Sequence, residues 1–221
     1  MGKCDEMKNF LNEIRKPQDN VSLAVKVRNT LLIFALGVVL GVFSKWLDNL
    51  SIDDTFLWQH VIGVLDLGNF FSGFSIWLLI ALAISVFSKT PLRASLNTFL
   101  FFVGMTVSYH LYTVLFSGFN PRDYMMIWYG ITLVSPLLAF VCWYAKSNHK
   151  ISIIISSLIF FVMFSTCFSM GMWYFGLRGI LDFLVFVGTC IVLYVSPKNT
   201  GMSMILGCVL AFLIRIPFFM A

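Results

Sequence analysis

Charged side chains are scarce in this 221-residue chain. Only 11% of its residues are Asp, Glu, Lys or Arg, against about 25% in a soluble domain. So few charges do not cover a water-soluble surface of this size. Hydrophobic residues make up 59% of the chain, in blocks near the ~20 residues that a helix needs to cross a ~30 Å hydrocarbon layer.

Strand-like alternation is also missing from these blocks. In lipid only helices and closed barrels satisfy all their backbone polar groups, so we predict an all-α fold: a polytopic helical bundle in a membrane. The net charge of +5 then concerns membrane orientation and anionic lipid, and nucleic acid is not an expected partner.

Motifs for catalysis and cofactor binding are absent from the sequence. It contains no HExxH, no GxSxG, no phosphate-binding glycine loop and no pair of intramembrane aspartates. The five cysteines lack CxxC spacing and are interpreted as small hydrophobic residues. Asp53, Asp54, His60 and Asp66 lack the spacing of metal ligands. We therefore predict no enzyme, no cofactor and no metal site.

Seven apolar segments follow a polar leader and predict seven transmembrane helices, near residues 28–46, 69–88, 93–116, 123–144, 151–170, 178–195 and 201–220. Residues 28–221 would form a single transmembrane domain. Residues 1–27 form the leader, which indicates either a short amphipathic helix on the membrane surface or a solvated tail. The stretch 47–68 contains four aspartates, and its middle, TFLWQHVIGVLDLG, is too short and too polar to span. It predicts a helix lying at the outer interface and ended by Gly68.

Lysine and arginine indicate the orientation, because cytoplasmic loops are enriched in them. With the N-terminus inside, seven spans place 11 of the 15 Lys and Arg residues on the inner side. The outer side keeps Lys45, Arg122, Arg178 and Arg215. Removing one span would move every later loop and weaken this bias. We therefore predict a multi-pass protein of the cell (plasma) membrane, with its N-terminus inside and its C-terminus outside.

The segment SYHLYTVLFSGFNPRDYMMIWYG, residues 108–130, carries a histidine, four tyrosines, an arginine and an aspartate. It is interpreted as the outer hairpin between the third and fourth spans. Asn120 is predicted to cap the fourth helix, with Pro121 at its first position. Pro136, in the middle of that helix, is expected to kink it and to free the carbonyl near Thr132.

Two polar stripes run along the third and fourth spans at helical spacing. One consists of Thr106, Tyr109, His110, Thr113 and Ser117, and the other of Tyr124, Trp128, Thr132 and Ser135. Facing each other, the stripes would line a cavity open to the outside. The alternative is an aromatic belt, with hydroxyls bonded to their own backbones. His110 is either a structural histidine or a group for proton relay or ligand contact.

Arg178 and Asp182 lie four residues apart at the outer start of the sixth span, so both face the same way. The helix dipole stabilises Asp182 there but opposes Arg178. Two interpretations of Arg178 remain. It reaches lipid phosphate or pairs with Asp182, or it holds an anionic group of a ligand that arrives from outside.

Small residues repeat at four-residue spacing in the first, third and last spans, which lets helix backbones approach closely. The helix-packing candidates are Gly37, Gly41, Gly104, Ser108, Ser203, Gly207 and Ala211. They are compatible with contacts inside the chain, with a second copy, or with another membrane subunit.

These observations predict a small integral membrane protein that binds or translocates a small solute through an outward pocket between the third, fourth and sixth spans. The ligand-binding candidates are Tyr109, His110, Thr113, Tyr124, Trp128, Arg178 and Asp182. Arg178 would hold an anionic group and be held by Asp182, while Trp128 would stack on the solute.

Two other functions stay open. The protein is alternatively a non-catalytic accessory or assembly subunit of a membrane complex, in which the outer polar residues only anchor the helices in the lipid bilayer. A weaker alternative is an intramembrane enzyme that modifies lipid. In size and composition the chain is similar to the substrate-binding membrane subunits of vitamin transporters, which commonly have six spans where seven are predicted here.

Overall fold

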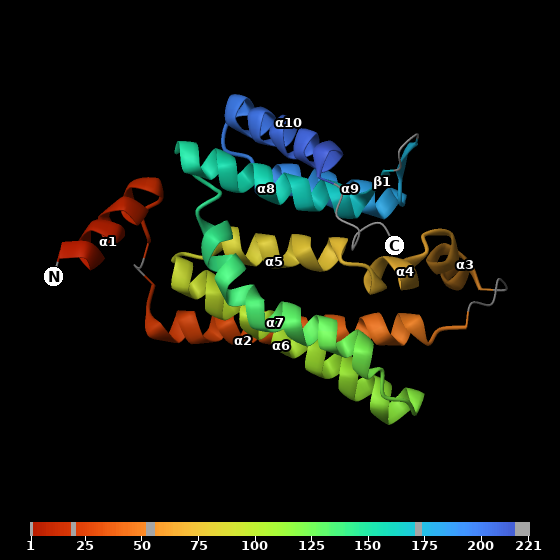
Figure 1. The fold of residues 1–221 in the computed structure, drawn as a ribbon. Coiled ribbons are helices and arrows are strands. Elements are labelled where there is room, and N and C mark those ends of the chain that lie inside the picture. Colours follow the sequence, from red (N-terminus) through yellow and green to blue (C-terminus); the bar gives the residue numbers. More distant parts are fainter. Residues whose placement is uncertain (1, 19–20, 52–55, 171–173, 215–221) are drawn as a thin grey trace.

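A computed structural model describes residues 2–18, 21–51, 56–170 and 174–214. Within these ranges the protein is a helical bundle with one short hairpin (Figure 1). Its elements are α1 (Gly2–Ile14), α2 (Leu23–Asp48), α3 (Leu57–Val64), α4 (Leu67–Ser72), α5 (Ser75–Phe87), α6 (Pro91–Tyr112), the π-helical turn η1 (Thr113–Ser117), α7 (Arg122–Trp143), α8 (Lys150–Cys167), β1 (Phe168–Met170), β2 (Phe175–Leu177), α9 (Ile180–Val192) and α10 (Pro197–Leu213).

Four helices are long and apolar enough to cross a membrane: α2, α6 continued by η1, α7 and α8. They support the all-α membrane class. The helices α5 and α9 are apolar but have only 13 residues each. At 1.5 Å per residue they are about 20 Å long, shorter than the predicted spans at 69–88 and 178–195.

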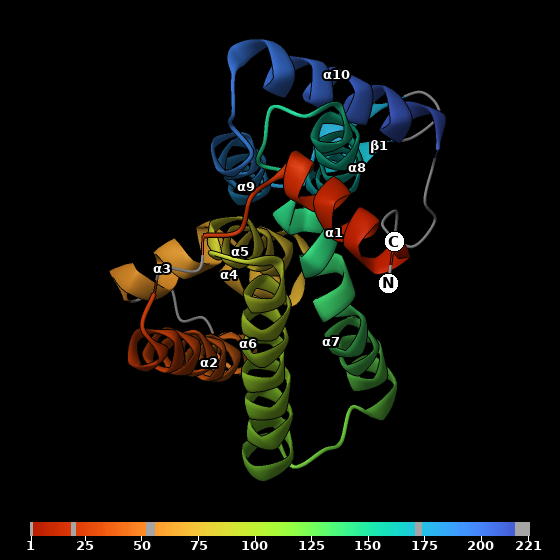
Figure 2. The ribbon, with the colours of Figure 1, turned by 90° about the vertical axis from the view of Figure 1, so that its left-hand side faces the viewer.

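Helix α5 is central to the bundle. In Figure 2, which views the bundle from the end at which α1 lies, α5 separates α2, α6 and α7 from α8, α9 and α10. Buried Trp77 and Ala81 of α5 pack with Phe101 of α6 and Trp128 of α7. Leu82 packs with the other group of helices. We call the two ends of the bundle the α1 end and the α4 end.

The predicted interfacial stretch 47–68 is not one helix. Helix α3 ends at Val64, and Asp66 adopts a left-handed φ of 50° at the start of α4. Gly68 therefore lies inside α4 and does not end a helix. Asp and Asn adopt this conformation more readily than most residues, which explains why the chain turns here.

Two further differences concern the ends of spans. The predicted fifth span, 151–170, stops as a helix at Cys167, and the chain continues as β1, which pairs antiparallel with β2. Asn120 does not cap α7: the N-cap residue is Pro121, without a side-chain cap. The carbonyl freed by Pro136 is that of Thr132, and it accepts a hydrogen bond from Ser135 Oγ at 2.8 Å.

The small residues of α2 and α6 lie where these two helices cross. A Cβ atom on Gly37 would overlap the carbonyl oxygen of Phe101, and one on Gly104 would lie 2.6 Å from that of Phe34. Ser108 Oγ donates to Val38 O at 3.1 Å. Backbones this close exclude any larger side chain, so the crossing depends on glycine.

Helices α8 and α10 cross in the same manner. A Cβ atom on Gly207 would lie 2.5 Å from Phe160 Cβ. Ser203 Oγ donates to Ile153 O at 3.2 Å, and Ala211 is fully buried. The small faces of α2, α6 and α10 thus make contacts inside the chain.

The leader ends against the bundle. Ile14, the last residue of α1, packs with Ala94 and Trp143. Arg15 Nη1 donates to Trp143 O at 2.5 Å and Nη2 to Val86 O at 3.0 Å. Those carbonyls lie at the C-terminal ends of α7 and α5, where the helix dipole favours a cation. Burial lowers the pKa of Arg15, and the segment around it is packed rather than a solvated tail.

Candidate functional site

The polar stripes of α6 and α7 face each other, as their spacing predicts, and they are in direct contact. The hydroxyls of Thr106 and Thr132 are 3.0 Å apart. Each hydroxyl is also within hydrogen-bond reach of a carbonyl of its own helix, Phe102 O for Thr106 and Trp128 O for Thr132. A hydroxyl has one proton, so one of the two donates across to the other threonine, which accepts and donates to its own helix. Threonine hydroxyls commonly bond the backbone one turn earlier in this way.

A charged cluster lies closer to the α4 end than this contact and joins α2, α4 and α6. Asp48, the last residue of α2, accepts hydrogen bonds from Tyr109 Oη at 2.6 Å and from Ser72 Oγ at 2.9 Å. Lys45 Nζ is 3.6 Å from the same carboxylate, and its side chain is only 8% exposed. We call Lys45, Asp48, Ser72 and Tyr109 the Asp48 cluster.

Aromatic rings complete the α6–α7 face. The ring centroids of Tyr109 and Tyr124 are 6.0 Å apart, and those of Tyr124 and Trp128 are 6.4 Å apart. Trp128 stacks on Phe74 at 5.0 Å. Its ring is therefore occupied by a side chain of the protein itself.

His110 lies at the edge of this face. Its Nδ1 is 2.6 Å from Tyr129 Oη, and its Nε2 is 3.0 Å from Asn120 Oδ1. Both ring nitrogens thus have partners in the 108–130 hairpin. Asn120, the predicted helix cap, binds this histidine instead.

Little space is left between α6 and α7. The cavity lined by Thr106, Tyr109, Tyr124 and Trp128 has a volume of about 10 Å³. A single water needs about that much, so the α6–α7 face is filled by its own side chains.

A larger pocket opens elsewhere at the α4 end, because α5 and α9 are short. Helix α5 begins only after Gly73, whose ψ of 172° is extended, and α9 begins after extended Gly179. Helices α2 and α6 with η1 have 26 and 27 residues, about 40 Å at 1.5 Å per residue. Helices α5 and α9 are about half as long, and the space lies where they begin, next to α4 and the end of α8.

This space is a pocket of about 590 Å³, which we call the α4–α9 pocket. Its lining residues come from the end of α3, from α4, from the end of α8, and from the starts of α5 and α9 with the residues just before them. Many of them are polar: Asp66, Asn69, Ser72, Ser75, Thr166, Arg178 and Asp182.

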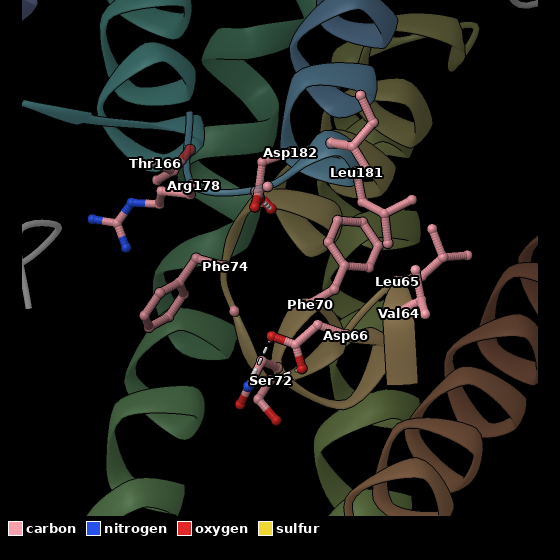
Figure 3. Close-up of a pocket in the computed structure, with 15 residues that line it drawn as sticks. Val64, Leu65, Asp66, Phe70, Ser72, Phe74, Thr166, Arg178, Leu181 and Asp182 are labelled. Carbon is pink, nitrogen blue, oxygen red and sulfur yellow. Dashed lines mark hydrogen bonds between the residues drawn. The ribbon is translucent and has the colours of Figure 1, made fainter. Parts of the chain in front are cut away.

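Figure 3 shows how the charged groups lie in this pocket. The carboxylate of Asp182 accepts a hydrogen bond from buried Ser75 Oγ at 2.5 Å. The exposed side chain of Arg178 extends away from that carboxylate (Figure 3). Asp66 lies across the pocket and accepts hydrogen bonds from Asn69 Nδ2 at 2.9 and 3.0 Å.

The predicted ligand residues thus fall into two groups rather than one pocket. Arg178 and Asp182 line the α4–α9 pocket. The other five, Tyr109, His110, Thr113, Tyr124 and Trp128, lie on or beside the α6–α7 face, where Thr113 Oγ1 donates to Tyr109 O at 2.8 Å. The reason is packing: α9 contacts α5 and α8, whereas α6 contacts α2, α5 and α7.

Sequence reasoning missed Asp48, Asp66 and Ser75 as site residues. The spacing of Lys45 and Asp48, three residues apart at a helix end, is a signal that sequence alone carries. Ser75 carries no such signal, since its partner Asp182 is 107 residues away.

Metal ligation receives no support from the part of the chain that the structure describes. No group of three or more His, Cys, Asp or Glu side chains is placed there to hold a metal ion. Asp53 and Asp54 lie outside the described residues. No protein-family model, curated protein or solved structure matches this chain.

Proposed function

We propose that this is a multi-pass protein of the cell membrane that binds or translocates a small polar solute in the α4–α9 pocket. The observation that carries the proposal is a pocket of about 590 Å³ with charged side chains of both signs at one end of an apolar bundle. Ligand sites usually have volumes of about 300–1,000 Å³. Charged groups at membrane depth are costly and commonly functional.

The charges of the pocket favour a particular kind of solute. Arg178 presents a guanidinium, which binds carboxylate or phosphate through paired hydrogen bonds. Asp66 and Asp182 present carboxylates from other parts of the wall (Figure 3). A solute with both an anionic group and an ammonium group complements this arrangement. The proposal is for a binding or transport protein and not for an enzyme.

We further propose seven spans, with the α1 end in the cytoplasm. The support is the grouping of cations at the α1 end. Arg15 lies in the leader, Lys89 and Lys146 lie in turns, and Lys150 and Lys198 lie in the first turns of α8 and α10. Cytoplasmic loops are enriched in Lys and Arg. A reporter that is active only outside the cytoplasm, fused after Ala221, should be active. An inactive reporter would contradict this orientation.

Thermal unfolding of the purified protein in a solute screen tests the binding site. A solute that binds the folded state raises the melting temperature in proportion to the logarithm of its concentration. We expect zwitterionic solutes to stabilise the wild-type protein, and Arg178→Ala to abolish that shift. Arg122→Ala is the matched control, because Arg122 is exposed at the start of α7 and does not line the pocket.

Two results would contradict this proposal. One is a screen in which no charged or zwitterionic solute stabilises the wild-type protein. The other is a shift of the same size in Arg178→Ala as in Arg122→Ala.

A further inference from the structure

An apolar crevice lies between α5, α6, α7 and α8, with a volume of about 300 Å³. Its walls are almost entirely hydrocarbon, including Leu78, Leu138, Ile155, Leu158 and Met163, with only three hydroxyls. A cavity of this kind binds apolar groups and stays dry.

The three hydroxyls of the crevice already have partners. Ser85 Oγ donates to Ala81 O at 2.7 Å and lies 3.0 Å from Thr98 Oγ1. Ser135 Oγ donates to Thr132 O. The crevice therefore offers van der Waals contact and not hydrogen bonds, and its complement is a hydrocarbon chain.

The crevice opens sideways, toward the region where lipid would lie. Its rim includes Leu138 of α7 and Leu158 of α8, whose side chains are 57% and 52% exposed. Both helices are long and apolar enough to span a membrane. A chain of a bilayer lipid thus reaches the crevice without crossing water.

The crevice and the α4–α9 pocket lie along the same two helices and share no lining residue. On α5, Ser75 lines the pocket and Leu78, one turn further, lines the crevice. On α8, Thr166 lines the pocket and Met163 lines the crevice. The two spaces thus follow one another along these helices, the polar one at the α4 end and the apolar one from the middle of the bundle toward the α1 end, where Val141 and Cys142 near the end of α7 line it.

The pocket and the crevice together extend over about the thickness of one leaflet of a bilayer. From Ile155 at the deep end of the crevice to Thr166 at the pocket is eleven residues of α8. At 1.5 Å per residue this is about 16 Å, half of the ~30 Å hydrocarbon layer.

We infer that the ligand of the α4–α9 pocket is an amphiphile, namely a membrane phospholipid with an amine-bearing zwitterionic headgroup. Its phosphate binds beside Arg178, its ammonium group faces Asp66, and one acyl chain occupies the crevice between α5, α7 and α8. This inference rests on the proposed function, because it names the solute class of the same pocket.

The test compares two probes that share a headgroup. Palmitoyl lysophosphatidylethanolamine carries the headgroup and one chain, and glycerophosphoethanolamine carries the headgroup alone. Both are titrated into the full-length protein in amphipol, with the melting temperature as the readout. We expect the lysolipid to bind about ten-fold or more tightly than glycerophosphoethanolamine, since each buried methylene of its acyl chain adds to the affinity.

A variant at the rim of the crevice distinguishes the contribution of the acyl chain to binding from that of the headgroup. Leu158→Trp places a larger ring over the crevice and should weaken binding of the lysolipid by about ten-fold, leaving glycerophosphoethanolamine unchanged. Ile154→Trp is the matched control, because Ile154 is 60% exposed on the same helix and does not line the crevice. Equal melting temperatures of the two variants without probe show that both fold.

Two negative results have different meanings. If both probes bind equally well and Leu158→Trp changes the binding of neither, the inference of an amphiphilic ligand is wrong, and the proposed solute site in the α4–α9 pocket is not contradicted. If neither probe binds, and no other solute shows a shift that depends on Arg178, the proposed function fails as well.

Discussion

Two polar regions lie at the α4 end, and they differ in what fills them. On the α6–α7 face, hydroxyls and rings contact one another, as in the Thr106–Thr132 pair at 3.0 Å. In the α4–α9 pocket, the charged side chains of Asp66, Arg178 and Asp182 surround about 590 Å³ of space. The stripe at helical spacing marks the filled region, and the open region has no stripe.

Helix length accounts for this difference. Helices α6 and α7 have 22 residues each and pack against each other, so their polar groups meet along the contact. Helices α5 and α9 have only 13 residues each, and the pocket lies where they begin. A polar stripe thus predicts a helix contact, whereas a short helix among long ones leaves a pocket.

The largest expected effect is in the filled region, at Asp48. Asp48→Ala leaves buried Lys45 without its counter-ion and removes the acceptor of Tyr109 and Ser72. Removing one partner of a buried ion pair costs about 3–5 kcal/mol, so the melting temperature should fall by about 10 °C. Asp123→Ala, at an exposed position of the same end, is the control. Similar melting temperatures for the two variants would show that the Asp48 cluster does not stabilise the fold.

Replacing Gly41 by alanine should have an intermediate effect on stability. Comparing it with the same change at Gly179 contrasts tight helix packing with the open pocket. Gly41 lies at the α2–α6 crossing, where an added Cβ would be 3.0 Å from Met105 Cα and closer still to the Met105 carbonyl. Gly41→Ala should cost about 1–3 kcal/mol through overpacking. Gly179 borders the pocket, and its added Cβ would be at an ordinary contact distance of 3.4 Å from Asp182 Oδ2.

Gly179→Ala should therefore change the free energy of unfolding by less than about 0.5 kcal/mol. Denaturation of both variants in the same detergent measures the difference. An equal loss in both would mean that the pocket is packed as tightly as the crossing.

A small loss of stability is expected at the Thr106–Thr132 pair. Hydrogen bonds between membrane helices contribute about 0.6 kcal/mol on average, so Thr132→Val should lower stability by that amount. Thr189→Val in α9 is the control, because Thr189 Oγ1 donates only within its own helix, to Val185 O at 3.0 Å. A larger loss in Thr189→Val would contradict the role of the cross-helix pair.

Part of this arrangement could be predicted from the sequence. The apolar blocks predict the membrane helices α2, α6, α7 and α8, and the spacing of Thr106 and Thr132 places both on one contact face. Patterns of this kind are local, because they depend only on residues within one helix. The four-residue repeat of Gly37 and Gly41 is another, and it coincides with a close backbone approach between α2 and α6.

The pocket could not be predicted in the same way. Residues 69–72 and 178–179 adjoin apolar segments, so the sequence extends both spans past the points where α5 and α9 begin. The partners of the pocket are also distant: Asp182 accepts from Ser75, 107 residues earlier. Which helices lie beside α9 depends on the packing of the whole bundle, and local periodicity carries no information on it.

The central claim is that the open pocket, and not the filled face, binds the ligand. The most direct test measures the ligand-induced rise in melting temperature for Arg178→Ala and His110→Ala side by side, with the solute that stabilises the wild-type protein most. The account predicts that the rise is lost in Arg178→Ala and kept in His110→Ala. A rise that survives in Arg178→Ala and disappears in His110→Ala would contradict it.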